Sequence, residues 1–357
     1  MLTSTDDLRI RELRELASPI EVIRAHPRTE AATRTVLDAR RAFTGILQGR
    51  DDRLAVVVGP CSIHDPVAAL DYARRLVGLR QRLGDRLEVI MRVYFEKPRT
   101  TVGWKGLIND PRLDGSFDID EGLRTARGLL LDIANLGLPA ACEFLDMTTP
   151  QYIADLVSWA AIGARTTESQ IHRELASGLS CPVGFKNGTD GNVRIALDAV
   201  LSASHPHHFL AVTKEGRSAI AATAGNPDCH VILRGGKAPN YDAASVDAAC
   251  AEIERSGGRA AVMIDASHDN SGKKPENQPV VLADIGAQVA AGDTRIIGVM
   301  VESNLVGGRQ ALVAGQPLTY GQSITDGCID WTTTETVLAD LAEAVARRRA
   351  VPKQSVA

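Results

Sequence analysis

Basic side chains stand at the ends of several apolar runs in this sequence. The run Leu87–Val93 contains Arg92 and continues into Lys97-Pro-Arg99. Arginine presents a planar fork of N–H donors and lysine a compact point charge, and both suit phosphate or carboxylate oxygens. Proline at position 98 keeps Lys97 out of helical geometry, which predicts an extended loop. Other apolar runs end in the same way, at Arg165, Lys186 and Arg234.

These cations would crowd one site if all the runs ended at the same place. Like charges at such density repel each other unless anions lie among them, so the pattern predicts a substrate with one or more phosphates and room for a carboxylate. Arg234-Gly-Gly-Lys237 adds flexible backbone for a phosphate, but it is not a nucleotide P-loop because the GxxxxGK[ST] spacing is absent.

A second group of side chains has the chemistry of metal ligands. Cys61 follows the first apolar run, His268 follows the seventh, Glu302 follows the eighth, and Asp326 lies further downstream. One thiolate, one imidazole and two carboxylates suit a divalent ion and leave room for a substrate oxygen. For Cys61 taken alone, a buried structural cysteine is the competing interpretation. His64 is open as a second ligand or as a residue that orients its neighbours.

The elements that must position these residues are eight short runs rich in Val and Ile, alternating with amphipathic helical stretches. They are Leu54–Gly59, Leu87–Val93, Ala140–Phe144, Ala160–Ala164, Pro182–Lys186, Val231–Arg234, Ala261–Asp265 and Ile296–Val301. Eight such units predict an α/β fold, a (β/α)8 TIM barrel, whose chemistry lies at the carboxyl ends of the strands. A doubly wound open sheet is the alternative, but the Gly-rich dinucleotide turn expected after its first strand is absent.

The barrel prediction brings polar or ionisable groups to one rim. Each run contributes one of them: Cys61, Arg92, Glu143, Arg165, Lys186, Arg234, His268 and Glu302. A single such residue could arise by chance, whereas eight together indicate an active site for a heavily anionic substrate.

Two segments add to the expected barrel, which spans residues 51–350. Residues 1–50 form an N-terminal extension in which Leu8, Ile10, Leu13 and Leu16 already fall at helical spacing, and we expect it to make regulatory or oligomer contacts. Between the fifth and sixth runs, Phe209–Thr213 and Ser218–Ala222 flank Lys-Glu-Gly-Arg and predict a β-hairpin, inserted at about 207–224.

Composition narrows the class of protein. The chain has 357 residues and a net charge of -4, which argues against the broad basic face of a nucleic-acid binder. It shows neither a secretory signal pattern nor an apolar run long enough to span a membrane. Six irregularly spaced cysteines favour reduced thiols and a cytoplasmic location.

Several longer motifs resemble those of type I 3-deoxy-D-arabino-heptulosonate 7-phosphate (DAHP) synthase. They are Gly59-Pro-Cys-Ser-Ile-His-Asp-Pro66, Lys97-Pro-Arg-Thr-Thr101, Gly163-Ala-Arg-Thr-Thr-Glu-Ser169, Gly184-Phe-Lys-Asn-Gly-Thr-Asp190, Leu233-Arg-Gly-Gly-Lys237 and Gly298-Val-Met-Val-Glu-Ser303. The resemblance covers nearly the whole chain. It implies an enzyme that condenses phosphoenolpyruvate with D-erythrose 4-phosphate and water and releases phosphate, in the first step of the shikimate pathway to chorismate and the aromatic amino acids.

The resemblance also implies roles for the rim residues. One divalent metal ion (Mn, Fe, Co, Zn or Cu) would be held by Cys61, His268, Glu302 and Asp326. Phosphoenolpyruvate would be held by Arg92, Lys97, Arg165, Lys186 and Arg234, with backbone N–H groups near Gly163 and Ala164. Arg99 and Thr100 would take the phosphate of erythrose 4-phosphate.

We assign the proton chemistry to two residues. Lys97 is the candidate acid for the developing alkoxide, because its cationic neighbours should favour proton release. Glu143 is expected to orient the attacking water.

In the resembled family, the N-terminal extension and the hairpin form a feedback site for an aromatic amino acid. The residues that fit the phenylalanine-sensitive pattern are Asp6, Asp7, Ile10, Phe144, Met147, Pro150, Gln151, Leu175, Leu179, Ser180 and Phe209. Ala211 and Ala221 depart from it by replacing a serine and a larger aliphatic residue, which leaves tryptophan and tyrosine open as effectors. A homodimer or homotetramer is expected, with the extension packed across subunits; a hairpin used only for subunit packing is the alternative.

Two other functions compete with this interpretation. The sister enzyme 3-deoxy-D-manno-octulosonate 8-phosphate synthase shares the barrel but uses arabinose 5-phosphate, and Lys97-Pro-Arg-Thr together with the regulatory additions favours the four-carbon sugar. A non-catalytic amino-acid sensor would be expected to lose metal ligands or phosphate-binding cations, and none of these is missing.

Overall fold

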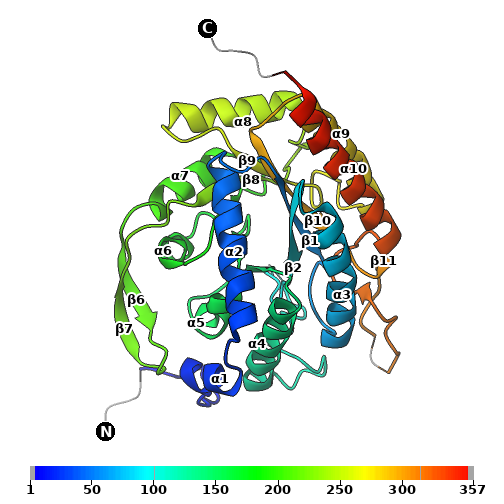
Figure 1. Cartoon of the computed structure of the whole chain (residues 1–357). Coiled ribbons are helices and arrows are strands. Elements are labelled where there is room, and N and C mark those ends of the chain that lie inside the picture. The colour runs from blue at the N-terminus through cyan, green and yellow to red at the C-terminus, as the bar shows by residue number, and fades with distance from the viewer. Residues whose placement is uncertain (1–4, 100, 314, 353–357) are drawn as a thin grey trace.

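Eight parallel strands close into a barrel in the computed structural model, which describes residues 5–99, 101–313 and 315–352 (Figure 1). Their order around the barrel is β1-β10-β9-β8-β5-β4-β3-β2. The strands are β1 (Leu54–Gly59), β2 (Leu87–Arg92), β3 (Ala140–Glu143), β4 (Trp159–Ile162), β5 (Val183–Lys186), β8 (Cys229–Leu233), β9 (Val262–Asp265) and β10 (Ile296–Glu302). Because β1 pairs with both β2 and β10, the sheet has no open edge. The predicted (β/α)8 fold is confirmed.

One helix follows each barrel strand. In chain order these are α3 (Pro66–Leu83), α4 (Ile119–Asn135), α5 (Thr149–Ile153), α6 (Gln170–Gly178), α7 (Arg194–Ala203), α8 (Ala243–Arg255), α9 (Gln278–Ala290) and α10 (Trp331–Ala350). Local sequence sets where they begin: Asp65 caps α3 by accepting from two backbone N–H groups, and Pro66 occupies its first turn. Within the described residues, no helix has the length and apolarity to cross a membrane.

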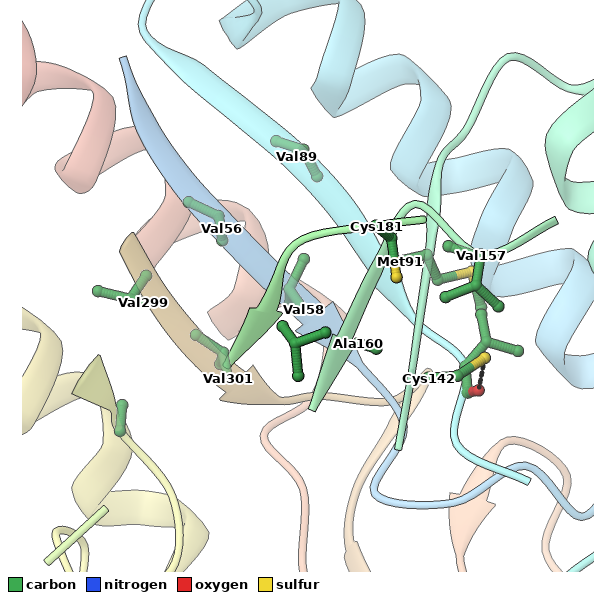
Figure 2. Packing of buried hydrophobic residues seen from close by; sticks show 14 of the residues in the cluster. Val56, Val58, Val89, Met91, Cys142, Val157, Ala160, Cys181, Val299 and Val301 are labelled. Carbon is green, nitrogen blue, oxygen red and sulfur yellow. Dashed lines mark hydrogen bonds between the residues drawn. The ribbon is translucent and has the colours of Figure 1, made fainter. Parts of the chain in front are cut away.

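The barrel strands are buried on both faces, which explains their continuous apolar sequences. Val57 and Ile90 belong to one cluster with Trp159, while the alternating residues Val56 and Val89 belong to the cluster shared with the helices (Figure 2). Successive side chains of a strand point to opposite faces, so the first cluster fills the barrel and the second lies between barrel and helices.

The N-terminal extension closes the amino end of the barrel with α2 (Glu30–Leu47), which follows the short helix α1 (Pro19–Ala25). Arg40 donates to the carbonyl of Val157, just before β4, and Thr44 donates to Asp228, just before β8. Phe43 packs its ring 5.1 Å from that of His230 and 6.1 Å from that of Trp159. The extension is therefore part of the barrel's core.

The expected helix around Leu8–Leu16 is wrong, because residues 5–18 contain no helix. Leu8 and Leu13 are 73% and 81% exposed. Helical spacing of apolar residues stabilises a helix only when another surface buries the apolar stripe, and this chain offers none to that segment.

The predicted hairpin is present as β6 (His208–Val212) and β7 (Ser218–Ala222), antiparallel and outside the barrel (Figure 1). β6 ends one residue earlier than predicted, so five residues connect the strands. The N–H of Thr213 donates to the carbonyl of Arg217 and closes that loop. Ile20 donates its N–H to the carbonyl of Lys214, which ties the hairpin's tip to α1.

The fourth strand shows why strand limits are hard to predict. The prediction ran over Ala160–Ala164, whereas β4 is Trp159–Ile162. Thr166 and Thr167 both donate their N–H groups to the carbonyl of Gly163, so the chain turns there instead of continuing the strand. A minor parallel pair, β11 (Val306–Arg309) and β12 (Gln322–Ser323), lies in the segment that carries Asp326.

Phe43→Ala should destabilise the fold by about 3–5 kcal/mol, because it removes a fully buried ring at the barrel's amino end. Leu37→Ala is the matched control on the same helix, since Leu37 is 41% exposed. Urea unfolding of both variants checks this. Equal midpoints for the two variants would mean that α2 does not support the barrel core.

Candidate active site and a second pocket

A cavity of about 160 Å³ opens at the carboxyl ends of the barrel strands. Most of the predicted site residues line it: Lys97, Arg99, Glu143, Gly163, Ala164, Arg165, Lys186, Arg234, His268, Glu302 and Asp326. Cys61 and Arg92 do not belong to the lining, and Thr100 lies outside the described residues. Closure of the barrel thus brings together groups that are more than 200 positions apart in the chain.

Arg92 lies at the base of the site, where 1% of its side chain is exposed. It donates to Glu302 at 3.0 Å, to the carbonyl of Pro60 at 3.1 Å and to the carbonyl of Cys61 at 3.2 Å. Its guanidinium also lies 3.7 Å from the centre of the Tyr94 ring. The residue was expected at the open mouth; the structure instead buries it against the metal-ligand candidates.

The four predicted metal ligands converge on one place. Ligand atoms of Cys61, Glu302 and Asp326 all lie within 4.8 Å of one another. The Nε2 atom of His268 lies 4.0 Å from Glu302 Oε1, at the edge of this group. Three residues from loops and one from a strand end therefore share a donor set that fits a divalent transition ion.

The backbone at His268 supports a functional assignment. Its φ angle is 54°, in the left-handed region that non-glycine residues seldom adopt. Backbone strain of this kind persists where surrounding contacts hold it, and it concentrates at functional sites. The ring of His268 lies with Nδ1 2.9 Å from Asp265 and Nε2 4.0 Å from Glu302.

Burial and neighbouring charges shift the pKa values of Cys61 and Asp326. Burial, with the nearby Glu302 carboxylate, raises the pKa of the Cys61 thiol to about 11. Burial works against ionisation of Asp326 as well, but Lys97 and His268 together hold its pKa below the usual value. A bound cation would favour the thiolate, since metal coordination stabilises the deprotonated sulfur.

The cations at the site are largely paired, which corrects the expectation of an uncompensated positive cluster. Lys186 lies 2.8 Å from Asp265 and Lys97 lies 3.7 Å from Asp326. Arg234 forms an ion pair with Asp269. Arg165, by contrast, is exposed and forms no hydrogen bond or ion pair with any described residue. Carboxylates thus hold most of the cations in place before a substrate enters.

Lys97 faces anions, so the argument that cationic neighbours favour proton release is wrong for this structure. Its Nζ lies 3.1 Å from Cys61 Sγ. Burial alone would lower the pKa of Lys97, but the Cys61 and Glu302 groups outweigh burial and raise it above the usual value. Release of its proton therefore requires a new acceptor or a new cation nearby.

Glu143 and Gly163 occupy one corner of the cavity. A Cβ atom at position 163 would come within 2.2 Å of Glu143 Oε1, so a side chain there would force that carboxylate to shift. The Gly163 carbonyl is already occupied by Thr166 and Thr167, which leaves the following backbone at the cavity wall. This placement suits a carboxylate that orients a polar group of a ligand.

Several lining residues were not predicted from the sequence. Thr166, Thr189, Ser267, Ser271, Lys273 and Gln278 all border the cavity. Asp265 lies behind it and pairs with Lys186 and His268. Asp265 ends a predicted strand and stands three residues before a predicted ligand, so its position could have signalled a role. Ser271 and Gln278 carry no such signal, because they reach the cavity only through the fold.

A second pocket, of about 510 Å³, lies between the hairpin, α5 and α6. Seven of the predicted regulatory residues line it: Met147, Pro150, Gln151, Leu175, Leu179, Ser180 and Phe209. Ala211 and Ala221 line it as well, together with the charged residues Arg28, Arg40, Asp155 and Lys214. The pocket thus combines an apolar wall with charges of both signs.

Four predicted regulatory residues do not line this pocket. Phe144 is fully buried in the core shared by barrel and helices. Asp6, Asp7 and Ile10 are exposed in the non-helical N-terminal segment. Within one copy of the chain, these three residues contribute nothing to the pocket wall.

The chain is similar to known proteins over nearly its whole length. Residues 27–339 match the DAHP synthetase I family. The chain is 62% identical to the Phe-sensitive phospho-2-dehydro-3-deoxyheptonate aldolase of Escherichia coli (strain K12), over 96% of this chain and 98% of that protein. It is 55% identical to the Trp-sensitive enzyme of Enterobacter agglomerans, over 97% of this chain and all of that protein.

Two solved structures of proteins with the same name also superpose on this chain. A phospho-2-dehydro-3-deoxyheptonate aldolase from Francisella tularensis superposes with a TM-score of 0.94 at 53% identity, covering 95% of this chain and 99% of that one. The enzyme of the same name from Thermotoga maritima has a TM-score of 0.55 at 17% identity and shares the fold.

Glu96, next to Lys97, should make the stability of the fold depend on pH. It is 8% exposed, and burial together with Asp146 and Glu143 raises its pKa to about 8. The folded protein therefore keeps a proton that the unfolded chain releases near 4.5. Stability should fall as the pH rises between these two values, because the unfolded state then binds fewer protons.

Glu96→Gln should lessen this loss, since its side chain stays neutral. Urea midpoints at about pH 5.5 and about pH 8.5 should differ more for the wild type than for the variant. Glu254→Gln, at an exposed position on α8, is the control and should behave as the wild type. Parallel pH dependence in wild type and Glu96→Gln would rule out a buried neutral carboxyl.

Proposed function

Because this chain belongs to the DAHP synthetase I family, we propose how the residues at its barrel rim carry out the reaction that this membership assigns. The enzyme condenses phosphoenolpyruvate with D-erythrose 4-phosphate and water to 3-deoxy-D-arabino-heptulosonate 7-phosphate and phosphate, the first step of the shikimate pathway. The observation that carries the proposal is the convergence of predicted metal ligands and phosphate-binding cations on one cavity.

Phosphoenolpyruvate binds both to cations that already pair with carboxylates and to Arg165, which has no such partner among the described residues. Arg165 is free of other partners among the described residues, so its fork of donors is available to the phosphate. Lys186 and Arg234 are held by carboxylates and line the same wall. Arg92 acts from below the cavity floor, and the backbone near Gly163 and Ala164 supplies N–H donors.

Cys61, His268, Glu302 and Asp326 would hold one divalent metal ion. When bound, the ion supplies Lewis-acid polarisation of the sugar's aldehyde oxygen. Thiolate, imidazole and carboxylate ligands are accepted by Mn, Fe, Co, Zn and Cu alike, so any of these ions satisfies the proposal.

Residues of the chain itself orient the reactants and transfer protons. The enol carbon of phosphoenolpyruvate attacks the aldehyde carbon, and Lys97 gives a proton to the oxygen that becomes an alkoxide. That alkoxide is the new acceptor which Lys97 requires, given its raised pKa. Glu143 orients the water that adds to C2. One proton of that water replaces the proton given up by Lys97, and the other leaves with the phosphate as the C–O bond breaks and C2 becomes a ketone.

Arg99 and Thr100 take the phosphate of erythrose 4-phosphate. Arg99 is exposed at the cavity edge, and its Nε donates to the carbonyl of Trp104 at 2.8 Å, which leaves its other nitrogens available. The Lys97-Pro-Arg-Thr motif and the names of the relatives favour a four-carbon sugar over arabinose 5-phosphate.

The second pocket binds an aromatic amino acid as a feedback inhibitor. Its apolar wall suits the ring, and a zwitterion matches the mixture of Asp155 with Lys214 and Arg28. The relatives named Phe-sensitive and Trp-sensitive are both similar to this chain. Phenylalanine is the favoured effector because of the higher identity to the Phe-sensitive enzyme.

A homodimer or homotetramer completes the regulatory site. Leu8 and Leu13 of the N-terminal segment are exposed, as are Leu210 and Ile220 on the outer face of the hairpin. Burial of such apolar surfaces against another copy would be favourable and would bring Asp6, Asp7 and Ile10 to a neighbour's pocket. We place the enzyme in the cytoplasm, with no nucleic-acid or membrane partner.

Phosphate release from phosphoenolpyruvate should require both erythrose 4-phosphate and a divalent metal. Excess EDTA should abolish it, and added Mn or Co should restore it. A continuous phosphate assay measures the rate, with arabinose 5-phosphate as the competing acceptor. Faster turnover with arabinose 5-phosphate, or full activity in EDTA, would contradict the proposal.

Lys97→Met is the matched active-site variant for the same assay, because it keeps the side chain's length and removes the ammonium group. We expect a loss of at least about 100-fold in kcat. Unchanged kcat would refute the proton role of Lys97 while leaving the overall reaction intact.

Phenylalanine should inhibit the enzyme, and Leu175→Ala should weaken that inhibition about tenfold by removing part of the apolar wall. Ile171→Ala, on the same helix but 54% exposed, is the control and should leave inhibition unchanged. The readout is the half-inhibiting concentration at fixed substrate, repeated with tyrosine and tryptophan. Indifference to all three amino acids would remove the regulatory assignment.

A further inference from the structure

Asp265 is a fully buried carboxylate that contacts two different parts of the active site. Its Oδ2 lies 2.9 Å from His268 Nδ1 and 2.8 Å from Lys186 Nζ. Its Oδ1 accepts from the N–H of Ser267 at 3.0 Å and from the hydroxyl of Ser267 at 2.6 Å. The two oxygens thus accept three hydrogen bonds and make a close ion-pair contact with His268, and no part of the side chain is exposed.

These contacts determine which nitrogen of His268 carries the proton. The Ser267 hydroxyl lies 2.7 Å from His268 Nδ1, but its hydrogen is directed to Asp265 Oδ1. Both neighbours of Nδ1 can therefore only accept. Nδ1 must be the protonated nitrogen, and Nε2 keeps its lone pair on the side of Glu302.

The same oxygen that orients His268 also holds Lys186. Asp265 Oδ2 lies 2.8 Å from Lys186 Nζ and 2.9 Å from His268 Nδ1. The buried carboxylate therefore sits between a metal-ligand candidate and a cation that lines the cavity. A shift of the carboxylate would move both groups together.

We propose that Asp265 is a positioning residue that sets His268 in its ligating tautomer and, through the same oxygen, fixes Lys186 for phosphoenolpyruvate. The inference rests on the proposed metal and substrate roles of those two residues. Asp265 itself touches neither metal nor substrate. Its carboxylate makes the metal site and the anion site one connected unit, so a change there affects metal affinity and substrate affinity at once.

Asp265→Asn tests this with little change of shape, because the amide keeps one acceptor but presents N–H donors to groups that also donate. Metal-free protein is titrated with Co²⁺, and binding is followed by the thiolate-to-cobalt charge-transfer absorption that Cys61 would produce. This readout does not depend on turnover. We expect Co²⁺ affinity to fall by about 10–100-fold.

Kinetics at saturating Co²⁺ provide the second readout. The KM for phosphoenolpyruvate should rise about tenfold, because Lys186 loses its fixed partner, while the KM for erythrose 4-phosphate stays within about twofold. A residue that merely supports the fold would not separate the two substrates in this way.

Asp269→Asn is the matched control, since the Asp269 side chain pairs with Arg234 and Lys273 and forms no ion pair with the His268 ring or the Lys186 ammonium among the described residues. Its Co²⁺ affinity should match the wild type. If Asp265→Asn does not fold, Ser267→Ala replaces it: loss of the bond to Oδ1 should weaken Co²⁺ binding several-fold. Wild-type Co²⁺ affinity in folded Asp265→Asn, or in Ser267→Ala where that variant stands in, would overturn the inference.

The wild-type titration separates this inference from the proposed function. Absence of the charge-transfer band in the wild type would contradict the ligand set itself. A normal band in the wild type together with an unchanged Asp265→Asn would contradict only the positioning role.

Discussion

The buried ion pair between Arg92 and Glu302 is the interaction on which the active site depends. It joins the ends of β2 and β10, with β1 between them in the barrel, and its two members are 1% and 3% exposed. Arg92 also binds the carbonyls of Pro60 and Cys61, so the same guanidinium fixes the loop that carries a proposed metal ligand. Loss of either partner would leave an unpaired buried charge, which typically costs about 3–5 kcal/mol.

Pairing of this kind recurs around the cavity and explains how so many cations coexist there. Lys186, Arg234 and Lys97 each face a carboxylate, at Asp265, Asp269 and Asp326. A substrate phosphate then meets donors that are already oriented, and little reorganisation is needed when charge develops during the reaction. Arg165 is the exception, since it has no partner within the described part of the chain and remains available to an anion.

The two parts of the N-terminal extension differ in structure. Its helix α2 places Phe43 against Trp159 and His230 and completes the core at the barrel's amino end. The segment before α1 has no helix and exposes its leucines. One part of the extension is thus packed into the barrel core, while the other leaves its apolar side chains exposed. This division is what the proposed regulatory site, completed by another copy of the chain, would require.

The sequence by itself determined the barrel, because eight strands buried on both faces must be continuously apolar, as Leu54–Gly59 is. It also determined most of the rim, since residues at strand ends, such as Lys186 and Glu302, follow from the strands. Tertiary structure decided which of these residues meet and in what state. Arg92 lies under the cavity, Lys97 faces anions, and Asp265 bridges His268 and Lys186, because each depends on contacts between segments far apart in the chain. The spacing of Leu8 and Leu13 suits a helix, but both side chains are exposed. A helix there would need a surface that buries them, and the sequence alone does not reveal whether one exists.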